Sequence, residues 1–241
     1  MCEPFSCVVK SDLSILVGKS IAHHSHSEII QDAGLTAEIS VNQYARVELL
    51  PPDDQYASDV EGWKLILDEK RTPEWWEENL PEIDARVRDA AQKWQNKLRV
   101  LKEWTVEEGE WLIVIGSGAM ITLNDGHLRT YGNAQNTITQ NGGYLRTRDS
   151  SQNTITQNDG RLRTYNNSQN TITQNGGYLR TFNNSQNTIG QNDGYLDTFD
   201  NSQNTITQND GSLCTFDNSH NTITQHGGSL NTFHNSQNKM L

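Results

Sequence analysis

The stretch "NTITQNGGYLRTFNNSQ", residues 170–186, decides the architecture of the second half of the chain. It consists almost wholly of Asn, Gln, Thr, Ser and Gly, with Ile172 and Leu179 as its aliphatic residues. Such a composition alone is typical of a disordered, low-complexity tract. Nearly the same 17 residues recur seven times without an insertion, however, and a linker has no reason to keep so strict a register. The repetition therefore predicts a folded repeat structure.

Several positions of the repeat hold the same residue in all seven copies. The invariant columns run from Gly126 to Gly228, from Leu128 to Leu230, from Thr130 to Thr232 and from Ile121 to Ile223. Seventeen residues are too few for a pair of helices and enough for one turn of a β-solenoid with two short strands. Residues 120–241 are therefore predicted to form an all-β solenoid, or β-helix, of about seven 17-residue coils.

The two strands predicted for each coil are a Leu-x-Thr strand and a Thr-Ile-Thr strand. Because successive side chains of a strand point to opposite faces, the invariant Leu and Thr are expected in the core and the variable residues around them in water. The glycine column is expected at a corner that needs either a positive φ or a close backbone approach. A further invariant column, Asn136 to Asn238, is expected to hydrogen-bond from coil to coil as an asparagine ladder.

Residues 1–103 are predicted to form a small α/β domain, so the fold class is an α+β domain followed by an all-β solenoid. Strands are expected at 5–9, 13–17, 45–50 and 62–68. Residues 104–119 are expected to be a junction whose strand caps the first coil.

Two helices are expected in this first domain. Ser25 followed by Glu28 is a capping-box pattern, which predicts a short helix from His26 to Ala33 that ends at Gly34. Helical spacing of apolar residues predicts a longer helix that opens at Thr72-Pro73 and extends to Leu101. Pro81 is expected to interrupt or restart it, because proline fits best in the first turn of a helix.

The negative charge is concentrated in the first half of the chain. The net charge is −11; residues 1–115 carry 22 acidic and 12 basic side chains, and residues 116–241 carry 8 and 7. Direct DNA binding and binding to an anionic membrane need basic surface, so neither is expected. No apolar run approaches the roughly 18 residues of a membrane span, and the N-terminus lacks a signal-peptide pattern. Cys2, Cys7 and Cys214 lack a C-x-x-C spacing, which predicts reduced thiols and a cytoplasmic protein.

Three motifs in the first 105 residues or so carry a resemblance to a known group. They are "SHSEII" (25–30), "VELLPPD" (47–53) and "LDEKRTPEWW" (67–76). They resemble a family of uncharacterised bacteriophage and prophage proteins, in which such a domain precedes short C-terminal β-repeats. Ser27 departs from the acidic residue that is usual there. The resemblance implies a phage-type source and hence the cytoplasm of an infected or lysogenic bacterial host.

The sequence offers little that is typical of catalysis. It has no glycine-rich phosphate loop, no nucleophile elbow and no spaced Cys/His set, so no enzyme and no cofactor are predicted. The cluster His23, His24 and His26 invites a metal interpretation. Adjacent histidines give poor facial geometry, and the pattern favours a segment that leads into a helix instead, so no metal site is predicted.

The Leu-x-Thr strands present one candidate binding face. Outward guanidinium groups beside aromatic rings are suited to stacking on sugars, bases or a partner protein. The alternative is that the rings only stabilise neighbouring strands. The candidate residues are Arg129, Tyr131, Tyr144, Arg146, Arg163, Tyr165, Tyr178 and Arg180.

The Thr-Ile-Thr strands present the alternative face. Ranks of Thr-x-Thr on a flat solenoid resemble those of ice-binding proteins, although threonine is also a good residue for any exposed strand. The candidate residues are Thr137, Thr139, Thr154, Thr156, Thr171, Thr173, Thr205, Thr207, Thr222 and Thr224, with a gap at Gly190.

Three functions follow as hypotheses. The first is a non-enzymatic phage-type binding or assembly protein, whose solenoid surface engages a host factor, a ligand or itself. The second is ice binding through the threonine ranks. The third is an acidic mimic of nucleic acid that inhibits a host defence enzyme. Homo-oligomerisation is expected through the edge of the C-terminal coils, because an uncovered edge is a template for another strand.

Overall fold

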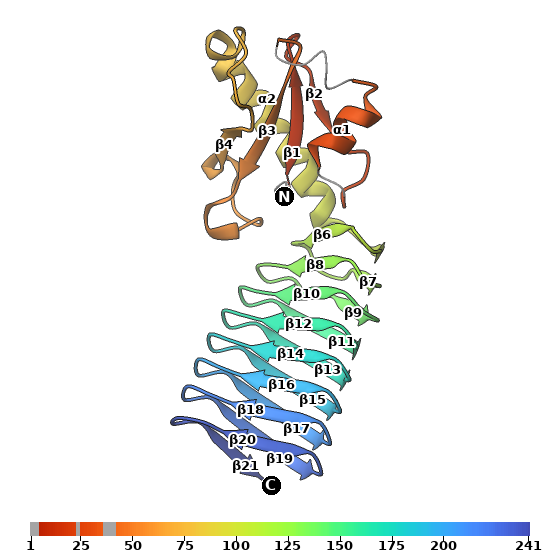
Figure 1. Cartoon of the computed structure of the whole chain (residues 1–241), viewed down its shortest axis with the longest axis vertical. Helices are drawn as coiled ribbons and strands as arrows, with labels where there is room; N and C mark the ends of the chain where they lie inside the picture. Colours follow the sequence, from red (N-terminus) through yellow and green to blue (C-terminus); the bar gives the residue numbers. More distant parts are fainter. Residues whose placement is uncertain (1–4, 23–24, 36–41) are drawn as a thin grey trace. The chain divides into compact units, whose positions relative to one another are not determined.

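A computed structural model describes residues 5–22, 25–35 and 42–241 of the chain. The chain forms two compact units, Met1–Leu98 and Arg99–Leu241. The first unit is a small α/β domain, and the second is a β-solenoid (Figure 1). The predicted fold class, an α+β region followed by an all-β solenoid, is confirmed.

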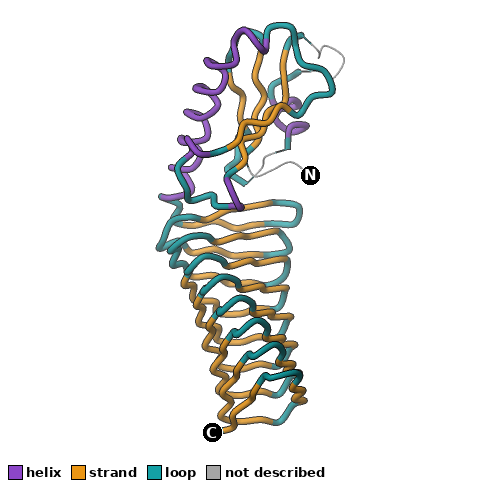
Figure 2. The backbone as a smooth tube through the Cα atoms, turned by 90° about the vertical axis from the view of Figure 1, so that its left-hand side faces the viewer, coloured by secondary structure: helices purple, strands orange, loops and turns teal. Residues whose placement is uncertain are grey.

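The first unit is built on a four-stranded antiparallel sheet with the order β2-β1-β3-β4. Helices α1 and α2 lie on opposite sides of this sheet (Figure 2). Two short 3₁₀ helices, Pro52–Asp54 and Val60–Gly62, connect β3 to β4. The bounds are Ser6–Lys10 for β1, Ile15–Val17 for β2, His26–Asp32 for α1, Tyr44–Leu50 for β3, Lys64–Leu67 for β4 and Trp76–Arg99 for α2.

Helix α1 begins at the predicted residue, His26, and ends at Asp32, one residue before the predicted end, with Ala33 as its C-cap. The Ser25 hydroxyl accepts a hydrogen bond of 3.2 Å from the backbone N–H of Glu28, which satisfies a donor of the first turn. Gly34 follows the helix with a φ of +66°, a left-handed conformation that glycine adopts without strain.

Helix α2 corrects the expectation for Pro81. The helix is continuous through this residue instead of being interrupted there. Pro81 lies in the second turn, so its missing N–H removes one hydrogen bond near the helix start. Ile83, Val87 and Ala91 on the following turns are fully buried, and this packing holds the helix together across the proline.

The second unit consists of two parallel sheets that share every coil, as Figures 1 and 2 show. We name them the even sheet and the odd sheet after their strand numbers. The even sheet contains β6 (Trp111–Val114), β8 (His127–Thr130), β10 (Tyr144–Thr147), β12 (Arg161–Thr164), β14 (Tyr178–Thr181), β16 (Tyr195–Thr198), β18 (Ser212–Thr215) and β20 (Ser229–Thr232). The odd sheet contains β5 (Glu103–Val106), β7 (Met120–Leu123), β9 (Thr137–Gln140), β11 (Gln152–Asn158), β13 (Gln169–Asn175), β15 (Gln186–Asn192), β17 (Gln203–Asn209), β19 (His220–His226) and β21 (Gln237–Met240).

The solenoid has about eight coils over residues 103–240, one more than the repeat count indicates. The additional coil is formed by β5 and β6, which pair in parallel with β7 and β8. Leu112 pairs with Leu128 and is buried like it, so this coil keeps the core column. It lacks the Asn, Gln and Gly positions of the repeat, which explains why the repeat pattern does not extend to it.

The core consists of the predicted columns. In the even sheet, each leucine pairs with the leucine of the next coil, as Leu145 does with Leu162, and the isoleucines of the odd sheet do the same. The leucines from Leu128 to Leu213 are fully buried, and so are the isoleucines from Ile138 to Ile223. The interior of each coil is therefore one leucine and one isoleucine wide, closed by threonine and asparagine side chains.

The corners explain the glycines and the Asn-rich turns. A Cβ atom on any of the column glycines from Gly126 to Gly228 would strike the preceding coil, in six of the seven with a backbone carbonyl oxygen as its nearest neighbour. Within this column Gly143 alone has a positive φ, so close approach is the general reason for glycine. The opposite corner holds two successive left-handed residues, such as Asn166 and Asn167 with φ of 52° and 64°. Asn and Asp tolerate this conformation better than other side chains.

Candidate functional site

The outward face of the even sheet brings together the predicted arginines and tyrosines. Strands β8, β10, β12 and β14 each place an arginine between the buried leucine and threonine, so the guanidinium groups form a rank along the solenoid. An aromatic or basic residue precedes each leucine and forms a second rank. We name the Arg–Tyr face after its members Arg129, Tyr144, Arg146, Arg161, Arg163, Tyr165, Tyr178 and Arg180.

The arginines of this face lie over aromatic rings. The guanidinium of Arg146 is 5.6 Å from the ring centres of both Tyr144 and Tyr165. That of Arg163 is 5.3 Å from Tyr144, and that of Arg180 is 4.7 Å from Tyr178. Each such cation–π contact contributes about 0.5–1 kcal/mol at an exposed site. The contacts also hold long, flexible side chains in defined positions before any partner arrives.

Arg129 continues the rank into the coil that the repeat does not include. Its guanidinium lies 4.6 Å from the ring centre of Trp111 on β6. His127 stacks on the same indole at 4.7 Å between ring centres. Burial and the neighbouring Arg129 charge lower the pKa of His127, so this ring is neutral at pH 7 and adds no charge to the face.

The C-terminal end of the Arg–Tyr face is internally neutralised. Asp197 lies 3.2 Å from the guanidinium of Arg180 and accepts a hydrogen bond of 2.5 Å from the Tyr178 hydroxyl. Burial, followed by the hydrogen bond to Asp197, raises the pKa of Tyr178. Arg180 therefore has its counter-ion within the solenoid.

The remaining arginines of the face lack such a counter-ion. Among the described residues, no carboxylate lies within ion-pair distance of Arg129, Arg146, Arg161 or Arg163. Burial is the largest single influence and works against the charged form of Arg146, but the hydrogen bond to Tyr144 and the charge interactions with Tyr144, Tyr165 and Tyr131 together raise the pKa of the guanidinium. The Nε of Arg146 is buried without a hydrogen-bond partner. The central part of the face thus keeps its positive charge.

Two further arginines on this side of the solenoid were not among the predicted residues of the face. Arg161 holds the position that tyrosine occupies in the neighbouring coils, and its side chain is exposed. Arg148 holds the position that follows the buried threonine, between Tyr131 at 5.9 Å and Tyr165 at 6.0 Å. The signal for Arg148 was present in the sequence, because this arginine stands in the same column of the repeat as the rings of Tyr131 and Tyr165.

Tyr131 is placed differently from the expectation. It was predicted to face outward with the other tyrosines, but its side chain is 1% exposed. Its hydroxyl lies 3.5 Å from the Arg129 guanidinium, and its ring lies under Arg148. Tyr131 therefore supports the basic residues from inside and is not part of the contact surface.

The aromatic column beyond Tyr165 is a stacking ladder. Tyr165, Phe182, Phe199, Phe216 and Phe233 stack in sequence, with ring centres 4.7–5.0 Å apart and ring planes within 9° of parallel. This geometry supports the structural interpretation of the phenylalanines, which is that they stabilise neighbouring coils.

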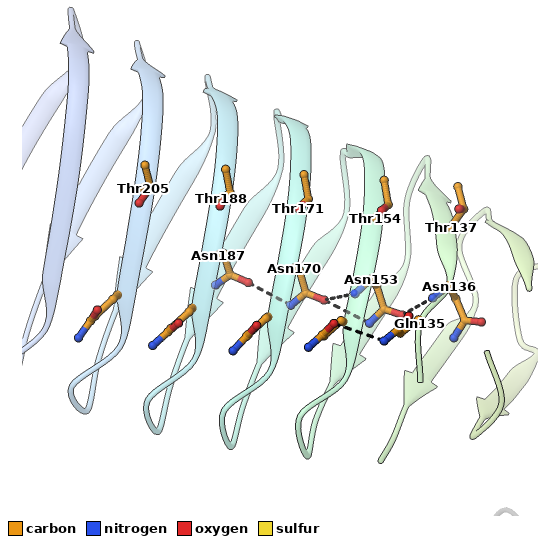
Figure 3. Close-up of a pocket in the computed structure, with 14 residues that line it drawn as sticks. Gln135, Asn136, Thr137, Asn153, Thr154, Asn170, Thr171, Asn187, Thr188 and Thr205 are labelled. Atoms are coloured by element: carbon orange, nitrogen blue, oxygen red, sulfur yellow. Dashed lines mark hydrogen bonds between the residues drawn. The ribbon is translucent and has the colours of Figure 1, made fainter. Parts of the chain in front are cut away.

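The outward face of the odd sheet carries the threonine ranks. Thr137, Thr154, Thr171, Thr188 and Thr205 form one column beside a parallel column of glutamines (Figure 3). Between the two columns runs a shallow groove of about 540 Å³, with the buried asparagine ladder as its floor. In the second threonine column, Thr139 and Thr156 are hydrogen-bonded at 2.9 Å.

This second column is less regular than the pattern suggests. The pairing of β11 with β13 continues from Ile155 to Asn158 and omits the two residues between them. Thr156 is exposed and Gln157 is half-buried, whereas Ile155 and Asn158 on either side of them are buried in the core. The threonines from Thr156 onward therefore lie at a local bulge and share their face with glutamines, which departs from a flat Thr-x-Thr lattice.

Of the three histidines in the cluster, His26 lies in the part of the chain that the structure describes. His23 and His24 lie outside the described residues. His26 is the first residue of α1, as a segment leading into a helix requires, and it is buried. Its Nε2 lies 3.1 Å from the carbonyl oxygen of Val47 on β3.

Comparisons with known proteins add no functional information. No family model, curated protein or solved structure matches this chain. In the part of the chain that the structure describes, no helix has the length and apolar character of a membrane span.

Proposed function

We propose that this protein is a non-enzymatic binding protein, and that its Arg–Tyr face engages an acidic segment of a partner protein. The observation that carries the proposal is the charge on Arg129, Arg146 and Arg163, which aromatic stacking orders and no described carboxylate neutralises. The planar guanidinium forms two parallel hydrogen bonds to a carboxylate, so an ordered rank of arginines suits a row of acidic side chains.

The dimensions of the face favour an extended peptide. Coils stack about 4.8 Å apart, so the rank from Arg129 to Arg180 spans roughly 14 Å, or about four residues of extended chain. Tyrosine and arginine together are the residues that most often dominate the affinity of protein interfaces. Their prior stacking lowers the entropy that is lost on binding.

The charge of the chain argues against nucleic acid as the partner. All six arginines of the repeat region lie between 129 and 180, while the chain as a whole carries a net charge of −11. Nonspecific nucleic-acid binding depends on many phosphate contacts, each of which releases counterions. A short basic face on an acidic protein instead selects a compact acidic target.

Capture from a bacterial lysate tests this proposal. We expect the immobilised wild-type chain to retain a protein that the double variant Arg146→Glu/Arg163→Glu loses, because like charges then face the acidic segment. The variant Lys70→Glu changes an exposed lysine of the first unit and is expected to retain the partner. Raising the salt concentration is expected to release it, since exposed ion pairs are screened.

Two outcomes of the capture contradict the proposal. Identical partners for the wild type and the double variant remove the Arg–Tyr face from consideration. Loss of the captured material after nuclease treatment identifies the partner as nucleic acid instead of protein.

Ice binding is the second candidate, and the exposed threonine column of the odd sheet favours it. Thr154, Thr171 and Thr188 pair in register from coil to coil, so their hydroxyl and methyl groups recur at the coil spacing. We expect the Thr171→Tyr variant to lose any thermal hysteresis that the wild type produces, because a bulky ring breaks the column. Absence of hysteresis in the wild-type protein eliminates this function.

The remaining expectations stay proposals of lesser weight. An acidic nucleic-acid mimic needs free carboxylates, whereas Glu69, Asp84 and Asp89 of the first unit are engaged by basic side chains. Self-association through β20 and β21 and a location in the cytoplasm of a phage host rest on the sequence arguments alone.

A further inference from the structure

Three potential metal ligands converge in the first unit from separate parts of the sequence. His26 is the first residue of α1, Glu48 lies on β3, and Asp68 directly follows β4. One ligand atom from each lies within 4.8 Å of the others. The histidine is buried, the glutamate is half-buried, and the Asp68 side chain is 52% exposed, so the cluster opens toward solvent on the aspartate side.

The buried histidine is held in one orientation. The backbone carbonyl of Val47 can only accept a hydrogen bond, so at the observed 3.1 Å the Nε2 of His26 carries the proton. The other ring nitrogen, Nδ1, lies 3.3 Å from a carboxylate oxygen of Asp68. Nδ1 is thus directed at the Asp68 carboxylate, as two ligand atoms of one shared ion would be placed.

We propose that His26 Nδ1, Glu48 and Asp68 bind a divalent transition-metal ion, with Zn²⁺ or Mn²⁺ as the best chemical match. A tetrahedral Zn²⁺ with bonds of about 2.0–2.1 Å holds neighbouring ligand atoms about 3.3–3.4 Å apart. The separation of His26 and Asp68 already has this value. The exposed carboxylate of Asp68 has room to adjust, and the solvent side leaves a position for water.

The ligand set discriminates between metals. One imidazole nitrogen with two carboxylates suits Zn²⁺, Mn²⁺ or Fe²⁺, whereas Ca²⁺ and Mg²⁺ prefer oxygen ligands throughout. The hydrogen bond from Nε2 to Val47 is also the outer contact that metal-binding histidines usually make through their second nitrogen.

A neighbouring carboxylate is excluded from the site by its own partner. Both oxygens of Glu69 accept hydrogen bonds from the Arg46 guanidinium, at 2.9 and 3.0 Å. This bidentate pair fixes the charge of Glu69, so among the described residues Glu69 is not one of the expected ligands.

Calorimetric titration of the full chain with Zn²⁺ at pH 7.5 tests the proposal. We expect one ion per chain, with binding weakened at least about tenfold in both Glu48→Gln and Asp68→Asn, which remove one charge with little change of shape. The variant Asp53→Asn is the matched control, because it removes an exposed carboxylate outside the cluster and is expected to bind as the wild type does. Co²⁺ in place of Zn²⁺ is expected to give a visible absorption band that the two ligand variants lose.

The double variant His23→Gln/His24→Gln separates this site from simple chelation by neighbouring histidines, and we expect it to leave the affinity unchanged. The proposal is overturned if the wild type takes up no Zn²⁺, if the two ligand variants bind it as tightly as the wild type, or if only the His23/His24 variant loses it. Circular dichroism of each variant establishes that a lost signal does not come from an unfolded chain.

Discussion

Asparagine is the residue that makes so polar a solenoid possible. The side chain of Asn170 donates to Asn187 at 3.0 Å and to the Thr147 hydroxyl at 3.1 Å, so both hydrogens of its buried amide are used. A second, fully buried ladder runs from Asn158 through Asn175 and Asn192 to Asn209, with bonds of 2.5–2.6 Å. Buried amides that pair with their own copies cost little, and each ladder ties a coil to the next.

Replacing one member of a ladder is expected to destabilise the protein measurably. Asn170→Ala leaves buried polar groups of Asn153 and Asn187 without this partner, which costs about 1–3 kcal/mol of the free energy of unfolding. The neighbouring Gln169 is exposed, and Gln169→Ala is expected to change that free energy by no more than about 0.5 kcal/mol. Urea denaturation of both variants measures the difference; equal stabilities contradict the role assigned to the ladder.

The two ladders also differ in how far the sequence reveals them. The column that contains Asn170 is invariant and leads directly to the prediction of a ladder. The burial of the column that contains Asn175 is not predicted, because strict alternation after Ile172 places that asparagine outside. A local bulge returns it to the core, and such a bulge leaves no mark in the pattern of polar residues.

At the scale of the elements, the short strands follow from the invariant columns, but the positions of neighbouring segments do not. The coil of β5 and β6 shares only its apolar residues with the repeat, so its pairing was predicted as a cap and not as a full coil. The proposed metal ligands meet because β3 pairs with β4 in one antiparallel register, with Val47 opposite Leu67. Nothing in a single sequence specifies that register, and His26, Glu48 and Asp68 therefore stayed separate in the sequence analysis.

The Arg–Tyr face, too, is only partly predictable from the sequence. Alternation along the Leu-x-Thr strands predicts which arginines face outward, and the ranks of Arg146 and Arg163 are where it places them. The burial of Tyr131 and the neutralisation of Arg180 by Asp197 depend on side chains in adjacent coils. These contacts follow only when the coils are stacked, and they reduce the predicted face to its central arginines.

At the scale of the whole solenoid, the core columns and the side-chain ladders all depend on the 17-residue register between successive coils. Each coil contacts its neighbours in the same way, so stability is expected to be close to a sum over coils and their interfaces. Removing a whole repeat preserves every column, whereas a shift of one residue turns each side chain of a strand to the opposite face.

A pair of deletions measures this dependence. Removal of residues 187–203 takes out one 17-residue repeat and joins Gln186 to Asn204, so we expect a folded solenoid with a modestly lower melting temperature. A deletion longer by one residue, which removes Asn204 as well, is expected to unfold the coils that follow it. Thermal unfolding monitored by circular dichroism separates the two; indistinguishable behaviour of the deletions shows that the register is not essential.

The first coil affects how the solenoid folds while the chain is being synthesised. Leu112, Ile113 and Val114 of β6 give this coil an apolar segment that no later coil possesses. It leaves the ribosome before the polar repeats do, and its edge is then ready to template the strand that emerges next. Growth from this seed needs a nascent chain only 17 residues longer for each added turn, so the Asn-rich segment spends little time exposed as an unpaired, aggregation-prone tract.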